Sequence, residues 1–191
     1  MRRIGITGGI GSGKSVVSRL LRIMGYSVYD TDSEAKRLME SSLEVVQKLS
    51  ECFGRDIYHN GRLNRGLLSS RVFGESDKIV LLNSIVHPVV RFDFYRWSES
   101  LNEEICFVES AILYESRFDE LVDEVWTVTA PEELRISRVR QRIGLTVEEI
   151  KKRMAAQLSE EEKQRRAAHI IWNDGNVSVI HTVLSLLKSL E

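Results

Sequence analysis

A glycine-rich loop near the start of the chain limits its possible folds more than any other feature. Residues 8–15 read Gly-Gly-Ile-Gly-Ser-Gly-Lys-Ser and match the pattern GxxxxGK[ST] in full. A short apolar segment at residues 3–7 precedes the loop, and apolar residues at helical spacing follow it. A strand, a glycine loop and a helix in this order are typical of a phosphate-binding site. The sequence therefore predicts an α/β fold that binds a nucleoside triphosphate through this loop.

Each residue type in the loop has a chemical reason to be there. Glycines let the backbone turn tightly enough for several N–H groups to face one phosphate. The helix predicted to begin near Lys14 adds its positive end. Lys14 supplies a charge for the β- and γ-phosphates, and the hydroxyl of Ser15 is a natural Mg²⁺ ligand. We expect the nucleotide contacts in this region from Gly9, Gly11, Ser12, Gly13, Lys14, Ser15 and Val16.

Short apolar segments alternate with helical patterns along the rest of the chain. Strands are predicted at residues 3–7, 27–29, 105–108, 125–129 and 169–172. This alternation is typical of a parallel sheet covered by helices on both faces. Two helical stretches interrupt it. We expect one domain over residues 1–191, with a core of 1–30, 103–135 and 167–191 and helical insertions at 31–102 and 136–166.

Three local signals predict helix boundaries. Pro131 is expected to open a helix at its first position. Thr146 and Glu149 have the spacing of a capping box at the start of the next helix. Pro88 follows His87 inside a helical pattern, where a proline is expected to kink or start a helix.

Composition excludes several classes of protein. The 27 Lys and Arg against 28 Asp and Glu leave a net charge of −1, so no overall basic field favours nucleic acid polymers or membranes. Two cysteines and four scattered histidines favour neither a disulfide framework nor a zinc site. No run of about 18 apolar residues is present. We expect a soluble, cytoplasmic protein that contacts neither nucleic acid polymers nor membranes.

Several charged residues have both a functional and a structural explanation. Asp30 and Asp32 follow the second predicted strand, where either could accept a proton in phosphoryl transfer or cap a helix. Glu109 ends the third strand, where it could hold Mg²⁺ through water or simply be solvated. Arg138 and Arg142, one helical turn apart, could reach one polyphosphate, although a solvated charged face is the more frequent explanation. These alternatives stay open on spacing alone.

At these residues the chain resembles the dephospho-CoA kinase family almost from end to end. The opening Ile-Gly-Ile-Thr-Gly-Gly-Ile-Gly-Ser-Gly-Lys-Ser is closer to the start of that family than the general loop pattern requires. Asp30-Thr31-Asp32 resembles its Asp-Ala-Asp, and Leu82 to His87-Pro88 resembles its helical middle. Gln157 and the segment 168–173 match its lid and last strand. The order and spacing of these pieces together are specific.

The resemblance implies a fold and an activity. The fold is a three-layer P-loop NTPase fold with a five-stranded parallel sheet, a helical acceptor-binding insertion at 31–102 and a helical lid at 136–166. The activity is transfer of the γ-phosphate of ATP to the ribose 3′-hydroxyl of dephospho-CoA, with Mg²⁺, in the last step of coenzyme A synthesis. Asp32 becomes the expected base beside Lys14, Arg138 and Arg142 close over ATP, and Asn173 lies by the adenine. The acceptor contacts that the resemblance implies are Thr7, Asp30, Asp32, Lys36, Arg37 and His87.

Three positions depart from the family pattern. The usual Arg after Asp-Ala-Asp falls on Lys36, with Arg37 beside it. The usual Pro-Leu-Leu-Phe-Glu segment begins with Ala111, and the usual Asp before the last strand is His169. Two alternatives to the kinase are a related kinase of another small nucleotide or metabolite, and a nucleotide-dependent switch without transferase chemistry. We expect a monomer or weak homo-oligomer.

Overall fold

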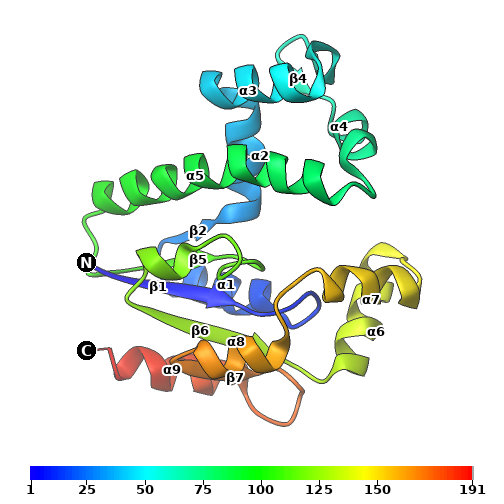
Figure 1. The fold of residues 1–191 in the computed structure, drawn as a ribbon. Helices are drawn as coiled ribbons and strands as arrows, with labels where there is room; N and C mark the ends of the chain where they lie inside the picture. Colours follow the sequence, from blue (N-terminus) through cyan, green and yellow to red (C-terminus); the bar gives the residue numbers. More distant parts are fainter. Residues whose placement is uncertain (191) are drawn as a thin grey trace. The chain divides into compact units, whose positions relative to one another are not determined.

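The computed structural model describes residues 1–190, which divide into two compact units (Figure 1). The sheet unit comprises residues 1–29 and 101–190, and the helical unit comprises Asp30–Ser100. The chain thus leaves the sheet unit once and returns to it once. Within the described residues, no helix is both long enough and apolar enough to cross a membrane.

The sheet unit is built on a five-stranded parallel sheet, as the sequence predicts. The strand order is β2-β5-β1-β6-β7. β1 pairs in parallel with β5 on one side and with β6 on the other, and β6 pairs in parallel with β7. The strands are β1 Arg2–Thr7, β2 Val28–Asp30, β5 Ile105–Glu109, β6 Glu124–Thr129 and β7 His169–Trp172.

Helices cover both faces of this sheet, because successive strand residues point to opposite sides. On one face, Trp126 and Val128 of β6 lie in a fully buried core with Val17 of α1 and Val183 of α9. On the other face, the hydroxyl of Thr127 donates to a carbonyl oxygen of α8. The three-layer prediction is confirmed. The helices of this unit are α1 Lys14–Ile23, α6 Glu132–Ile143, α7 Val147–Ala155, α8 Glu160–Arg166 and α9 Val179–Lys188, with a 3₁₀ turn η2 at Phe118–Leu121.

Local capping signals fix where α6 and α7 begin. The capping box predicted for α7 is present, with the Thr146 hydroxyl accepting from the Glu149 amide and the Glu149 carboxylate accepting from the Thr146 amide. Pro131 is the N-cap residue of α6, and the helix begins one residue later than predicted. The extended ψ of 142° at Pro131 keeps that residue outside the helix.

The helical unit contains one feature that the sequence reading missed. Its helices are α2 Thr31–Ser41, α3 Leu43–Phe53, α4 Arg65–Val72 and α5 Ser76–Ser100, with a 3₁₀ turn η1 at Arg55–Ile57. Between η1 and α4, an antiparallel hairpin pairs β3 (Tyr58–His59) with β4 (Arg62–Leu63). Asn60 and Gly61 form its turn with φ of 49° and 74°. Both residues lie in the left-handed region, which suits Asn-Gly and matches the twist of a hairpin.

α5 excludes one of the two alternatives expected for Pro88, which were to kink a helix or to start one. The helix runs from Ser76 to Ser100 with Pro88 inside it, so the proline does not start a helix. Val86 and Val90, on either side of the proline, are buried, as is Phe94 one turn later. Burial of this apolar stripe keeps the helix continuous although Pro88 cannot donate a backbone hydrogen bond.

Candidate active site

The glycine-rich loop joins β1 to α1 and has the backbone of a phosphate cradle. Gly8, Gly11 and Gly13 have φ of 144°, 81° and 98°. A Cβ on Gly8 would overlap the carbonyl oxygen of Val128, and one on Gly13 would overlap the amide of Asn173. The Lys14 ammonium donates to the carbonyl oxygens of Gly8 at 2.8 Å and Gly9 at 3.4 Å. The lysine is thus held at the mouth of the loop by the loop itself.

Two side chains predicted as nucleotide contacts meet at the far side of the loop. Arg138 of α6 donates to the carbonyl oxygen of Asn173 at 2.9 Å and lies 3.5 Å from those of Gly11 and Ser12. The Asn173 amide donates to the Ser12 carbonyl oxygen at 2.9 Å. The structure therefore brings Arg138 and Asn173 together against the loop. Arg142 is exposed, and it makes no hydrogen bond or ion pair with the described residues.

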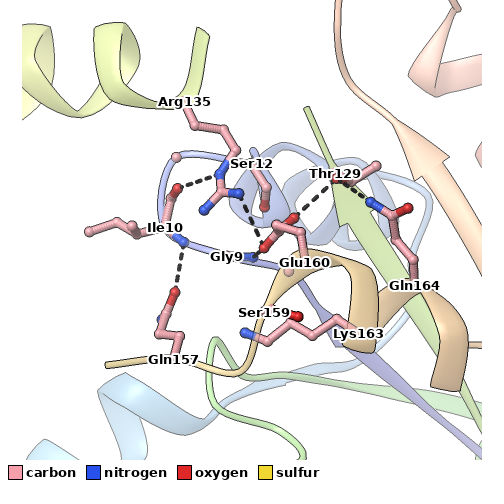
Figure 2. A network of polar contacts seen from close by, with 12 residues as sticks. Gly9, Ile10, Ser12, Thr129, Arg135, Gln157, Ser159, Glu160, Lys163 and Gln164 are labelled. Carbon is pink, nitrogen blue, oxygen red and sulfur yellow. Dashed lines mark hydrogen bonds and ion pairs between the residues drawn. The ribbon is translucent and has the colours of Figure 1, made fainter. Parts of the chain in front are cut away.

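A second group of side chains holds the loop from its outer surface, and the sequence reading did not find it. Figure 2 shows Arg135, Gln157 and Glu160 gathered around the Gly9–Ile10 segment. The Glu160 carboxylate accepts from the Gly9 amide at 2.8 Å, and the Gln157 side chain accepts from the Ile10 amide at 3.0 Å. Arg135 donates to the Ile10 carbonyl oxygen at 3.0 Å and pairs with Glu160 at 3.3 Å. One signal was available, because Arg135 lies four residues before buried Val139 and so shares its helix face.

Several oxygen atoms at the strand ends suit a hard cation. The Thr7 and Ser12 hydroxyls are buried without a hydrogen-bond partner, and so is the hydroxyl of Ser110, the residue after Glu109. Ser15 is exposed in the first turn of α1. Within the described residues, no group of three or more His, Cys, Asp or Glu side chains could enclose a metal. A few hydroxyl oxygens without a carboxylate cluster fit Mg²⁺, which is usually held by one or two protein oxygens together with phosphates and water.

The helical unit separates the two aspartates that the sequence could not tell apart. Asp30 is the N-cap of α2, and its carboxylate accepts from the amides of Asp32 and Ser33 at 3.0 and 3.2 Å. Asp32 is exposed in the first turn of the same helix. Its carboxylate makes no hydrogen bond or ion pair with the described residues. The capping explanation therefore applies to Asp30, and Asp32 keeps a carboxylate available for chemistry.

The same helix also distinguishes Lys36 from Arg37. Arg37 pairs with Glu34 and, at 2.7 Å, with Asp93 of α5. The hydrogen bond to Glu34, ahead of the interaction with Asp93, raises the pKa of Arg37. Lys36 is exposed and has no ion pair among the described residues. Arg37 thus ties α2 to α5, whereas the Lys36 ammonium is available to a ligand.

Comparison with known proteins identifies the family of this chain. A family model described as dephospho-CoA kinase matches residues 2–178. The chain belongs to the dephospho-CoA kinase family. A dephospho-CoA kinase from Bacteroides fragilis is 41% identical over 189 residues, which cover 98% of this chain and 92% of that protein.

Solved structures agree on the fold. The crystal structure of TT1252 from Thermus thermophilus has a TM-score of 0.85 and 36% identity, covering 100% of this chain and 98% of that one. A dephospho-CoA kinase from Campylobacter jejuni, 23% identical with the same coverage, has a TM-score of 0.74. At that identity the second likeness supports the fold alone.

Two of the positions that depart from the family pattern, Ala111 and His169, lie in the sheet unit. The carbonyl oxygen of Ala111 accepts from the Lys163 ammonium at 2.8 Å, and Glu115 pairs with that ammonium at 3.6 Å. Lys163 is fully buried, and burial lowers its pKa. The segment is thus tied to α8 through the Lys163 side chain, by a carbonyl contact that a proline at position 111 would also allow. His169 begins β7 and packs edge-on against Trp126, with ring centroids 6.3 Å apart.

Proposed function

We propose that this member of the dephospho-CoA kinase family transfers the γ-phosphate of ATP to the ribose 3′-hydroxyl of dephospho-CoA, the last step of coenzyme A synthesis. The observation that carries the proposal is the complete phosphate loop, with Lys14 held at its mouth by two loop carbonyls, in a chain that matches the family over residues 2–178. The reaction forms an oxygen–phosphorus bond to the acceptor and breaks the bond to ADP.

The triphosphate is bound by the inner side of the loop. Backbone amides of Gly11, Gly13, Lys14 and Ser15, with the amino-terminal end of α1, donate to the phosphates. The amides of Ser12 and Val16 instead donate to the carbonyl oxygens of Gly9 and Gly13, so any nucleotide contact of these two residues is made by their side chains. Gly9 allows the loop to pack against Glu160 and Arg135, because a Cβ at this position would overlap both side chains. Arg138 and Arg142 close over the phosphates from α6, and Asn173 lies beside the adenine.

The Ser15 hydroxyl would hold a magnesium ion, and Glu109 would hold it through water. When bound, Mg²⁺ neutralises charge on the β- and γ-phosphate oxygens. The protein's own part is to hold Lys14 against the same oxygens and to exclude water, which would otherwise compete as acceptor.

Asp32 accepts the proton of the acceptor hydroxyl as the new bond to phosphorus forms. Among the described residues its carboxylate has no partner to give up, unlike that of Asp30. A base of this kind typically contributes about 10²- to 10⁴-fold to the rate. Asp30 supports Asp32 by fixing the first turn of α2.

The acceptor is held by the helical unit and by Thr7. The Lys36 ammonium provides positive charge for the diphosphate of dephospho-CoA, since Arg37 is engaged by Glu34 and Asp93. His87 is half-buried on α5, and burial, followed by the charge of Arg91, lowers its pKa. A neutral imidazole can both donate and accept hydrogen bonds, which suits a ribose or an adenine. The predicted cytoplasmic location and the monomer or weak homo-oligomer stay predictions.

The test is the release of ADP by purified protein with ATP and Mg²⁺, comparing dephospho-CoA with AMP, adenosine and no acceptor. We expect turnover with dephospho-CoA alone, and no detectable turnover from Lys14→Ala. Product analysis should place the new phosphate on the 3′-oxygen. Turnover with AMP or adenosine but not dephospho-CoA would replace the proposed acceptor, and tight ATP binding without turnover would favour the switch.

A further inference from the structure

The outer surface of the phosphate loop is gripped by three side chains from the predicted lid region and its border, which we call the loop clamp: Arg135, Gln157 and Glu160. Arg135 comes from α6, Glu160 is the first residue of α8, and Gln157 lies between α7 and α8. All three belong to the sheet unit, as does the loop they hold. Figure 2 shows that each of the three contacts the backbone at Gly9 or Ile10, and that Glu160 also contacts Arg135 and Thr129.

These contacts determine which way the loop's peptide groups face. In a planar trans peptide, the C=O and the following N–H point in opposite directions. Glu160 draws the Gly9 N–H outward, which turns the Gly8 C=O toward the Lys14 ammonium, 2.8 Å away. Gln157 draws the Ile10 N–H outward, which turns the Gly9 C=O inward, where it accepts from the Ser12 amide at 3.1 Å and from the same ammonium at 3.4 Å.

The third peptide group is the one that concerns the nucleotide. Arg135 draws the Ile10 C=O outward, so the Gly11 N–H points away from the clamp, into the loop. Three consecutive peptides are therefore oriented from outside. Two of them hold Lys14, and the third presents an amide to the phosphates.

The charges of the clamp also fit a role beside a polyanion. The side chains of Arg135 and Glu160 are 5% and 16% exposed, so neither charge is well solvated. A buried ion pair seldom adds net stability over apolar residues. Here Arg135 offsets a carboxylate that would otherwise repel phosphates. The second Glu160 oxygen accepts from Thr129 on β6 at 3.0 Å, which fixes the carboxylate to the sheet.

We propose that Arg135, Gln157 and Glu160 are positioning residues that set the peptide orientations of the phosphate loop for nucleotide binding. Only the kinetic part of the test rests on the proposed function. The clamp connects α6 and α8 to the loop through Arg135 and Glu160. α6 also carries Arg138, which contacts the carbonyl oxygens of Gly11 and Ser12.

The test compares ADP dissociation constants, measured by calorimetry, for four variants and the natural chain. Gln157→Leu removes one outward contact, with the Ile10 amide, and should weaken ADP binding roughly 10-fold, the scale of one lost hydrogen bond to a buried or charged group. Glu160→Ala removes the contacts with the Gly9 amide, Arg135 and Thr129 and should weaken ADP binding at least as much. Glu160→Gln keeps an oxygen for the Gly9 amide and should stay within about 3-fold. The matched control is Glu161→Ala, because Glu161 has the same charge, is next on α8, and is exposed.

Kinetics with dephospho-CoA provide a second readout. Glu160→Ala should raise the KM for ATP and lower kcat while leaving the KM for dephospho-CoA within about 2-fold, and Glu160→Gln should rescue both. A merely structural role would instead lower the unfolding midpoint and the active fraction, and the KM for ATP would not change relative to the KM for dephospho-CoA.

The outcomes separate the clamp from the reaction. Equal losses in Glu160→Ala and Glu160→Gln would overturn the proposal, because charge rather than peptide orientation would then matter. ADP binding by Gln157→Leu equal to that of the natural chain would also overturn it. This second variant decides the matter if Glu160→Ala fails to fold, because it leaves no buried charge unpaired. If the natural chain does not phosphorylate dephospho-CoA, the proposed function fails, while the ADP measurements still test the clamp.

Discussion

At the scale of single residues, the structure assigns different work to side chains that look equivalent in sequence. Asp30 and Asp32 are two positions apart, yet one carboxylate is occupied by backbone amides and the other has no partner among the described residues. Lys36 and Arg37 differ in the same way. In both pairs, one residue stabilises α2 through structural contacts, and its neighbour has no side-chain contact of this kind among the described residues.

Asp32→Asn is expected to lower kcat by about 10²-fold or more while ADP affinity and the unfolding midpoint hold, because only the proton acceptor is lost. Asp30→Ala should instead lower the free energy of unfolding by about 1 kcal/mol through loss of the N-cap. Steady-state kinetics, calorimetry and urea denaturation of both variants check this. A drop in nucleotide affinity with unchanged kcat in Asp32→Asn would show that Asp32 is not the base.

At the scale of helices and strands, periodicity and motif spacing were enough to predict the strands, the phosphate loop and the α7 capping box. They were not enough for the hairpin at Asn60–Gly61, where two-residue strands are too short to show alternation. Its Asn-Gly turn was the readable signal. The Arg135–Glu160 pair was also missed, because its members lie 25 positions apart in a basic segment whose charges suggest a solvated face. Only tertiary packing shows that this face is buried.

Pro88→Ala is expected to raise the free energy of unfolding of the chain by about 1–3 kcal/mol. Alanine restores an N–H that can bond to the carbonyl of Ser84 in the continuous helix α5, and this outweighs the greater freedom of the unfolded chain. Urea denaturation measures the effect. Pro88→Gly should fall below Pro88→Ala, since glycine restores the bond but disfavours helix. A midpoint for Pro88→Ala at or below that of the natural chain would show that the proline is favourable in α5.

At the scale of the whole molecule, stability is expected to depend on pH through His87. Burial, followed by the charge of Arg91, lowers its pKa in the folded chain below the ordinary 6.5. The unfolded chain therefore binds more protons between the two pKa values, so stability falls as pH drops below about 6.5. The urea midpoint of the natural chain should lose more between pH 7.5 and pH 5.5 than that of His87→Gln. Equal losses in the two proteins would show that His87 does not contribute.

The reach of the clamp across the chain also has a consequence for biosynthesis. Gly9 and Ile10 are held by side chains 151 and 147 positions later in the sequence. A ribosome makes the loop before the side chains that support it. The nascent chain thus carries a recognisable phosphate motif before the side chains that orient it exist. Competence to bind nucleotide therefore follows synthesis of the clamp, and products truncated before Arg135 contain the motif without its bracing.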